Sequence, residues 1–408
     1  MKPFLYLLLA VSTLGRFVIA EDWPQAAGPN GNFIAEGKAP EKFSVSRNEN
    51  VLWRTRLPST GQGAAIVSGG RVFVTSHEPI TEDSEMGSMM FGLCFDAKTG
   101  KELWRREIPG TRVTDFSSLF SDNTAASPVA NGEFVCFSNV GGTTACFDFK
   151  GKEQWSWTWT PFGRHHARQH EPILHGDQVI LMHVPRNDLP AKATTKGGAK
   201  PLGTGRDLWT RLQSYDIRTG KRSWIAASAT SVHSTSLIGR SAAGSPAILT
   251  GRGGGHQPPE KPYGLSLVSA VDGSRIWDLE IKGYGAAQNA AWNKDVACLF
   301  AGKEHQTVDV KEGKPLDSVS LVEDVTVCRF ENGIYSTKTG QAMKFRKAIT
   351  NQSNCLVGDY HYFRAHDGFF LGRVNIRQGT VEYLQVPAQV VREPGKPDET
   401  RWRDATRN

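Results

Sequence analysis

The sequence contains few cysteines, and none of them lies in a spacing that binds a metal. Six cysteines occur among 408 residues, with no CxxC motif and no two cysteines side by side. A structural zinc site built on paired cysteines is therefore not predicted. Long apolar runs are also missing after the N-terminus, so we predict no transmembrane segment.

An excess of one charge is absent as well. Lys and Arg number 48 and Asp and Glu 41, which gives a formal net charge of +7, and the charges are interspersed rather than clustered. Nucleic-acid-binding domains usually show a basic patch or stripe. We therefore predict no nucleic-acid partner. The glycine-rich stretch 251–256 also lacks the Lys-Ser/Thr ending of a phosphate-binding loop.

The N-terminus has the pattern of a secretory signal peptide. Lys2 is followed by an apolar run at 4–11, and small residues offer a cleavage site before Glu21. Arg16 interrupts the apolar stretch, which makes it a poor membrane anchor. We predict that residues 1–20 are removed and that the mature chain is exported as a soluble protein to the periplasm or the extracellular space.

A short phrase recurs along the chain and dominates its organisation. In each copy an apolar strand ends at Asp, a tight turn with Gly follows, and the next strand ends on an aromatic residue. Asp can cap such a turn through its side chain, and Gly accepts the positive φ that the turn requires. The clear copies run over Asp96–Trp104, Asp148–Trp155 and Asp216–Trp224, a worn copy over Asp272–Trp277, and fainter ones end at Leu316 and Tyr383.

Two further short strands with a Gly-rich turn precede most copies, so the repeating unit has four strands. This is the pattern of a propeller blade, and an all-β propeller of seven to eight four-stranded blades is predicted. A β-sandwich with accidental similarity is the alternative. The predicted organisation is a signal peptide at 1–20, a polar lead-in at 21–49, the propeller at 50–386 and a polar tail at 387–408.

Two segments do not fit the repeat cleanly. Asn50–Arg54 reads like the last strand of a blade without the first three, and no partner for it is evident. Propellers often close by pairing strands from both termini. The segment 317–350 is interpreted as a further degraded blade.

Cys136 and Cys146 lie on either side of a Gly141-Gly142 turn, and a hairpin centred there would bring them together. An oxidising compartment would then permit a disulfide. The favoured alternative is that they are small core residues, because Cys146 stands at the same repeat position as Cys94.

The repeat phrase resembles that of a known family. Asp-x-x-Thr-Gly-Lys-x-x-Trp, as at Asp96–Trp104 and Asp216–Trp224, is similar to the repeat of the PQQ-like β-propellers, the relatives of quinoprotein alcohol dehydrogenase. The opening Asp22–Gly31 resembles the start of secreted bacterial members. The resemblance implies an eight-bladed propeller that is either a PQQ-dependent dehydrogenase or a non-catalytic scaffold of outer-membrane barrel assembly.

The cofactor that the resemblance implies is PQQ with calcium. Family dehydrogenases carry an adjacent Cys-Cys pair over the quinone, and Glu, Asn and Asp around the calcium ion. This chain has no Cys-Cys pair, and the carboxylate set has no assignable counterpart in the sequence. We therefore assign no cofactor, no cofactor-binding residue and no catalytic residue.

The sharpest local feature is a histidine-rich segment just before the first strand of the third unit. Polar residues stand at the same position before other units. First strands run side by side in the same direction, so their starts share one face and open onto the central channel. The candidate channel-rim ligand site consists of Asn123, His165, His166, Arg168, His170, His233 and Asn289. No metal is predicted there, because no Asp or Glu joins the histidines at a ligand-like spacing.

Three functions remain open at this point. The leading hypothesis is a binding or scaffold module without quinone, whose partner is a protein, a glycan or a small molecule that is neutral or anionic. One alternative is a PQQ-dependent oxidoreductase of an alcohol or sugar. The other is a polysaccharide-acting enzyme that uses the histidine and arginine side chains. Insertions at 78–88, 185–207 and 251–263 are expected to border the site.

Overall fold

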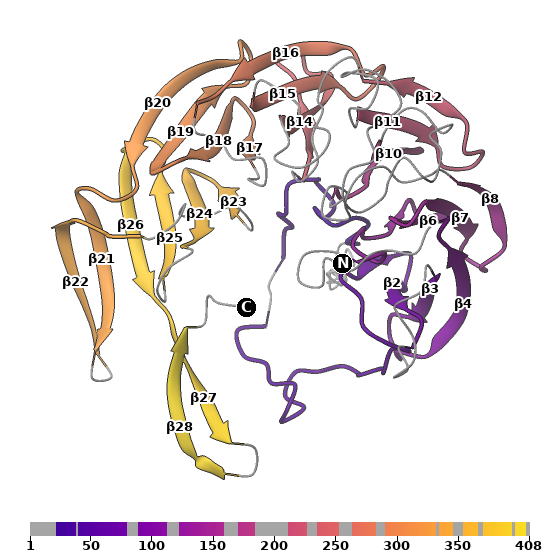
Figure 1. The fold of residues 1–408 in the computed structure, drawn as a ribbon, viewed down its shortest axis with the longest axis horizontal. Coiled ribbons are helices and arrows are strands. Elements are labelled where there is room, and N and C mark those ends of the chain that lie inside the picture. Colours follow the sequence, from indigo (N-terminus) through magenta and orange to yellow (C-terminus); the bar gives the residue numbers. More distant parts are fainter. Residues whose placement is uncertain are drawn as a thin grey trace, which may run out of the picture.

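The computed structural model describes residues 22–37, 40–79, 89–111, 122–158, 170–183, 211–226, 235–252, 263–282, 290–331, 334–345, 354–365, 370–393 and 396–404. Every named element in these ranges is a β-strand. The strands form sheets that follow one another in chain order around a ring (Figure 1). The predicted all-β propeller class is thereby confirmed. No helix in the described ranges is long and apolar enough to cross a membrane.

Five blades are antiparallel sheets of four strands in sequence order. The first holds β1 (Ile66–Ser68), β2 (Arg71–His77), β3 (Met89–Asp96) and β4 (Glu102–Pro109). The second holds β5 (Val129–Ala130), β6 (Phe134–Asn139), β7 (Thr143–Asp148) and β8 (Glu153–Thr158). The third holds β9 (Ile173–His175), β10 (Gln178–His183), β11 (Arg211–Asp216) and β12 (Arg222–Ile225).

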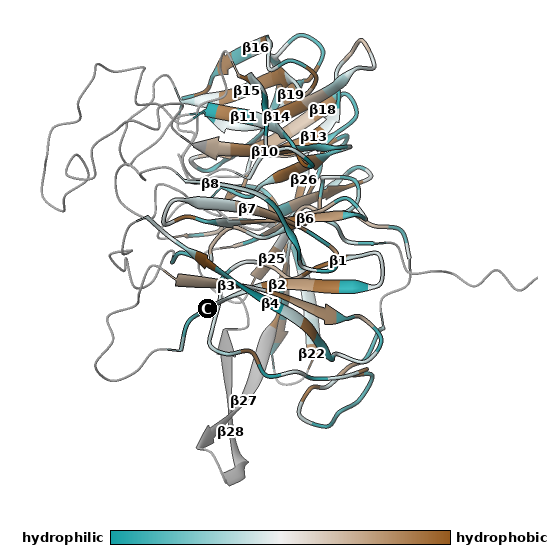
Figure 2. Ribbon diagram, turned by 90° about the vertical axis from the view of Figure 1, so that its right-hand side faces the viewer, coloured by the Kyte–Doolittle hydropathy of each residue, from teal (hydrophilic) through white to brown (hydrophobic). Residues whose placement is uncertain are grey.

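The fourth blade holds β13 (Leu237–Arg240), β14 (Pro246–Arg252), β15 (Gly264–Ser269) and β16 (Arg275–Glu280). The fifth holds β17 (Ala291–Asn293), β18 (Val296–Ala301), β19 (Glu304–Asp309) and β20 (Lys314–Ser320). The sixth holds β23 (Asn354–Val357), β24 (Tyr360–Arg364), β25 (Phe370–Asn375) and β26 (Thr380–Gln385). In the side view, hydrophobic residues lie on the strands and many of the connecting turns are hydrophilic (Figure 2).

The segment 317–350 does not form a blade of its own, which corrects the prediction. Its strands β21 (Val325–Glu331) and β22 (Ile334–Gln341) extend the sixth blade to a six-stranded sheet. The joint is parallel, with Thr326 opposite Glu382. A hairpin of β27 (Pro387–Glu393) and β28 (Lys396–Asp404) follows in the predicted polar tail and projects away from the ring in Figure 1.

A tryptophan joins each of the early blades to the next one. Trp104, Trp224 and Trp277 are each 9% exposed, and Trp155 is half-buried, so the aromatic residue of the repeat phrase is largely shielded from solvent on the last strands of successive blades. Their indoles pack against the turn glycine of the following blade. Indole Nε1 donates to a carbonyl oxygen of that turn in three of them: Trp104 to Phe149 at 3.1 Å, Trp155 to Ile217 at 2.8 Å and Trp277 to Val310 at 2.7 Å.

The repeat phrase of the fourth blade is shifted by three residues from the expected alignment. Ser269, not Asp272, occupies the position that Asp96 holds in the first blade. Ser269 N bonds to Ser274 O at 2.9 Å, as Asp96 N bonds to Lys101 O at 2.9 Å. Asp272 lies within the turn and accepts from the hydroxyl of Ser274 at 2.7 Å.

The segment around Trp53 makes the same contact without belonging to a named strand. Trp53 Nε1 donates to Ala97 O at 2.9 Å, and a Cβ on Gly100 would lie 2.5 Å from the indole. Trp53 therefore stands where the last strand of a closing blade would stand. The described residues hold six blades, so the predicted count of seven to eight requires this segment to belong to a further blade.

The cysteine alternatives resolve in favour of core thiols. Cys136 pairs with Cys146 across β6 and β7, and both are buried and unbonded to another cysteine. Cys146 donates a hydrogen bond from Sγ to Ile217 O at 3.1 Å. Burial raises the pKa of the Cys136 thiol well above its ordinary value, so these side chains act as core groups.

The lead-in after residue 21 crosses one mouth of the ring (Figure 1). It contacts the first strands of four successive blades. Val67 N bonds to Trp23 O at 2.9 Å, Ala130 N to Pro24 O at 3.0 Å, Leu174 N to Gln25 Oε1 at 2.8 Å and Ile238 N to Gly31 O at 3.3 Å. The polar lead-in is thus an integral part of the propeller.

Candidate functional site

Polar side chains gather where the first strands of the blades begin. Second strands run antiparallel to the first, so their ends lie on the same face. We call this set the polar belt; Gln62 is exposed, Glu171 is half-buried and the others are buried. The polar belt consists of Gln62, His77, Asp122, Asn123, Thr124, Ser127, His170, Glu171, Ser236 and Thr250.

The belt links the first blade to the second through backbone and side-chain hydrogen bonds. Gln62 N donates to Thr124 Oγ1 at 2.9 Å, and Asp122 N donates to Gln62 Oε1 at 3.1 Å. Ala64 N donates to Ser127 Oγ at 2.8 Å. Two chain segments about sixty residues apart are therefore tied together just before their strands start.

The belt continues to the third and fourth blades. Ser127 N donates to Glu171 Oε2 at 2.8 Å. His170 Nε2 and Ser236 Oγ are 2.8 Å apart, and Ser236 Oγ donates to Thr250 Oγ1 at 2.7 Å. The same face of four consecutive blades is thus joined by one run of polar contacts.

His77 and Asp122 are in close contact in the buried part of the belt. His77 Nε2 lies 2.8 Å from Asp122 Oδ2, and Thr124 donates to Asp122 Oδ1 from its backbone and its hydroxyl. Burial alone would raise the pKa of Asp122, but the bonds from His77 and Thr124 outweigh it and hold that pKa below its ordinary value. Asp122 is therefore an ionised carboxylate that neighbouring groups already satisfy.

The other two ionisable groups of the belt shift in the direction that burial dictates. Burial lowers the pKa of His170 to about 4, so this imidazole is neutral near pH 7. Burial raises the pKa of Glu171, although the bonds from Ser127 act in the opposite direction. A neutral histidine and a carboxyl that resists ionisation suit a buried inter-blade contact.

The structure places two of the seven predicted rim residues. Asn123 and His170 both precede the first strand of a blade, as expected, but both are buried. Asn123 Nδ2 donates to Met89 O at 2.9 Å. No direct contact joins these two side chains in the described ranges. His165, His166, Arg168, His233 and Asn289 lie outside the described residues.

The predicted insertions fall almost wholly outside the described residues. The strands that lead into two of them end at the belt, because His77 closes β2 and Thr250 lies near the end of β14. His77, Ser236 and Glu171 belong to the set but were not predicted from the sequence. Their partners are distant in the chain, and no local pattern marked them.

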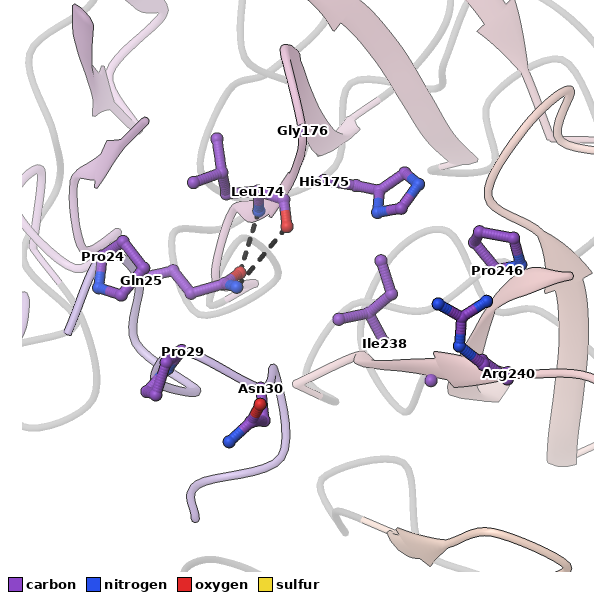
Figure 3. A pocket seen from close by; sticks show the side chains of 11 residues that line it. Pro24, Gln25, Pro29, Asn30, Leu174, His175, Gly176, Ile238, Arg240 and Pro246 are labelled. Atoms are coloured by element: carbon purple, nitrogen blue, oxygen red, sulfur yellow. Dashed lines mark hydrogen bonds between the residues drawn. The ribbon is translucent and has the colours of Figure 1, made fainter. Parts of the chain in front are cut away.

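A groove of about 310 Å³ lies at the opposite mouth (Figure 3). The lead-in forms one wall with Gln25 and Asn30, and the third and fourth blades form the other with His175 and Arg240. The Gln25 amide bonds to the backbone of Leu174 and fixes this wall. Burial first, and then the charge of Arg240, lower the pKa of His175. The groove therefore presents one cation and several neutral polar groups.

Residues 92–225 match the family model described as outer membrane protein assembly factor BamB. They cover the second half of the first blade and the whole of the second and third. The chain carries PQQ-like repeats. No curated protein sequence matches it.

Solved structures with PQQ-like repeats are similar to the chain at low identity. A quinohemoprotein alcohol dehydrogenase from Comamonas testosteroni has 13% identity and a TM-score of 0.50, over 84% of this chain and 65% of that one. BamB from Moraxella catarrhalis has 15% identity and a TM-score of 0.42, over 78% and 73%. A europium-containing methanol dehydrogenase has 12% identity and a TM-score of 0.46, over 80% and 66%. The likeness to the Comamonas enzyme shows a shared fold alone, and the chain spans about two thirds of the length of both dehydrogenases.

Proposed function

We propose that the chain is an exported PQQ-like repeat propeller that acts as a binding or scaffold module and holds no quinone. The observation that carries the proposal is that the polar belt forms hydrogen bonds between blades. Its members bond from one blade to the next, as in the contacts between the backbone N of Ser127 and the Glu171 carboxyl and between the side chains of His170 and Ser236. Groups engaged in this way hold the ring together and are not free to act on a substrate.

The carboxylates of the belt do not fit a calcium-bound quinone. Calcium takes six to eight oxygen ligands, several of them from carboxylates. Asp122 is engaged by His77 and Thr124, and Glu171 accepts a hydrogen bond from Ser127. The chain also lacks the adjacent cysteine pair of the family dehydrogenases. We derive no redox step for this protein.

Two further observations favour binding over catalysis. The family model that matches residues 92–225 is described for an assembly factor rather than an enzyme. The signal-peptide pattern of residues 1–20 supports export to the compartment in which such a factor would act.

The groove at the lead-in mouth is the site that we propose for a ligand. Its volume of about 310 Å³ is at the lower end of the range for small-molecule pockets. Arg240 gives it a positive charge, and His175 is neutral near pH 7 because its pKa is lowered. The ligand is therefore a neutral or anionic group, such as the end of an acidic glycan or peptide.

A binding screen with matched variants tests this proposal. The mature protein is screened against neutral and acidic oligosaccharides and peptides, and each ligand found is measured by calorimetry. Arg240→Ala should weaken an anionic ligand by about tenfold or more, which corresponds to one lost charge-assisted contact. Arg275→Ala, an exposed arginine on β16, is the control and should leave the affinity unchanged. Equal affinities for the wild type and Arg240→Ala would refute the groove as the site.

A further inference from the structure

Two histidines and a cysteine meet between the fifth and sixth blades, away from the belt and the groove. Cys298 lies on β18, His305 on β19 and His361 on β24, and all three side chains are buried. One potential ligand atom from each lies within 4.8 Å of the other two. No Asp or Glu of the described residues joins this group.

The two histidines occupy positions that hold aliphatic residues in the earlier blades, and these two positions face each other between neighbouring blades. Strand register places His305 where the third blade has Leu212 and the fourth has Leu265. His361 occupies the position that Ile248 and Ala297 hold in earlier blades. Leu212 packs with Ile248, and Leu265 packs with Ala297, in the cores between their blades. An aliphatic pair is therefore the ordinary solution here, and the imidazole pair replaces it at a desolvation cost.

The hydrogen bonds hold the imidazoles in an orientation suited to a metal. His361 Nε2 donates to Asn354 Oδ1 at 3.0 Å, which leaves a lone pair on Nδ1 of the neutral ring. That Nδ1 lies 2.9 Å from His305 Nε2. A hydrogen-bonded outer partner that fixes the ring is the usual arrangement around a metal-binding histidine.

The two imidazoles are already in the form that binds a metal, whereas the thiol must first lose its proton. Burial lowers the pKa of His305 to about 4, and burial with the nearby His305 lowers that of His361. Both rings are therefore neutral near pH 7, as metal binding requires. The Cys298 thiol is protonated, because burial raises its pKa to about 12.

We propose that Cys298, His305 and His361 form a binding site for copper(I). Thiolate and imidazole select soft or borderline ions, which leaves Cu⁺ and Zn²⁺ as the main candidates. One thiolate neutralises Cu⁺ fully, whereas Zn²⁺ would leave a net positive charge among Phe300, Leu356 and other apolar side chains. An unpaired buried charge is costly, so the monovalent ion fits this site better.

The two imidazole nitrogens need to move apart only slightly for binding. Two nitrogens about 2.0 Å from an ion in a trigonal arrangement lie about 3.5 Å apart, so the His305–His361 bond must open by about 0.5 Å. Cu⁺ displaces the Cys298 proton, which leaves to solvent, and His305 moves its own proton from Nε2 to Nδ1. One proton is released for each ion bound, and no electron is transferred.

The test is an anaerobic titration of the mature protein with Cu⁺ against a chromogenic Cu⁺ chelator, both as purified and after refolding with the ion. We expect one Cu⁺ per chain after refolding, bound by one sulfur and two nitrogens in X-ray absorption spectra. Its affinity should fall about tenfold for each pH unit lowered, because one proton is displaced. Failure of the refolded protein to bind, or a preference for Zn²⁺ over Cu⁺, would overturn the proposal.

Three variants separate the site from general thiol chemistry. Cys298→Ser should abolish binding, whereas Cys355→Ser should bind Cu⁺ as the wild type does. Cys355 neighbours Leu356 on β23 and faces the other side of that strand. The double variant His305→Leu with His361→Ala restores the aliphatic pair of the fourth and fifth blades, so it should fold and bind no Cu⁺. Retained copper in this variant or in Cys298→Ser would contradict the assignment.

Discussion

The indole Nε1 of Trp155 donates a 2.8 Å hydrogen bond to the carbonyl oxygen of Ile217 in the next blade. The same indole covers the turn glycine Gly220, where a Cβ would lie 2.6 Å from the ring. One tryptophan thus fixes both the spacing and the angle between two sheets. Because Trp53, Trp104, Trp224 and Trp277 cover turn glycines in the same way, this contact is the repeating joint of the ring.

Replacing one of these tryptophans should destabilise the whole propeller. Trp104→Ala removes a buried indole and its bond to Phe149, and it leaves a cavity between the first two blades. The expected loss in the free energy of unfolding is about 3–5 kcal/mol, measured by urea denaturation. A loss below about 1 kcal/mol would mean that the indole is not part of the joint.

The turn glycine should be sensitive for two separable reasons. Gly220 has a φ of +67°, and an added Cβ would also meet Trp155. Gly176 has a φ of +57° with no atom within 4 Å, so Gly176→Ala reports backbone strain alone. We expect Gly220→Ala to destabilise by about 1–3 kcal/mol more than Gly176→Ala. Equal losses in the free energy of unfolding for the two variants, measured by urea denaturation, would show that the Trp155 indole can move aside without cost.

Trp53 should contribute to the stability of the propeller although it belongs to no named strand. Its indole bonds to Ala97 and covers Gly100, so Trp53→Ala should lower the free energy of unfolding by about 1–3 kcal/mol. The neighbouring Leu52 is 80% exposed and serves as the control, since Leu52→Ala should change stability by less than about 0.5 kcal/mol. If both substitutions change the free energy of unfolding by similarly small amounts, Trp53 does not contribute to closing the ring.

Stability should fall between about pH 6.5 and pH 4 because His170 is buried as a neutral ring. Its pKa is about 4 in the folded protein, whereas the unfolded chain protonates near 6.5. The unfolded state therefore binds the extra proton, and stability that is complete above pH 6.5 is lost as the pH falls. At pH 5 the loss from His170 is about 2 kcal/mol.

Urea denaturation at pH 7.5 and pH 5.0 measures this loss, and His170→Gln isolates it. Glutamine keeps a polar group that can reach Ser236 but carries no titrating proton. The variant should lose about 2 kcal/mol less than the wild type between these two pH values. Identical pH dependence in both proteins would assign the effect to other groups, such as His305 and His361.

The sequence predicted the fold well where the signal is local. Asp, Gly and Trp recur in the phrase because the turn and the joint need them within ten residues of chain. The parallel pairing of β21 with β26 could not be predicted, because the paired residues are more than fifty positions apart. No hairpin turn joins the two strands directly, so no local sequence signal marks the pairing. The three-residue shift of the repeat phrase from Asp272 to Ser269 was not predicted for another reason. Both side chains can cap a turn, so the sequence does not tell the two alignments apart.

Only two residues of the predicted rim site, Asn123 and His170, can be compared with the structure. Asn123 and His170 do stand before first strands, but the groups that satisfy them come from Met89 and Ser236, distant in the chain. His77 carried no signal, because nothing near it in sequence reveals Asp122 as its partner. The pair of His305 and His361 could be recognised only once strand register placed them face to face.

The central claim is that this propeller holds no quinone, and calorimetry with PQQ tests it most directly. The mature protein is titrated with PQQ in the presence of calcium, and the same mixture is assayed for dye-linked oxidation of alcohols and sugars. We predict no binding tighter than about 10 μM and no turnover, because the belt carboxyl groups of Asp122 and Glu171 are engaged by His77 and Ser127 of neighbouring blades. Sub-micromolar binding of PQQ, or calcium-dependent oxidation, would contradict the account.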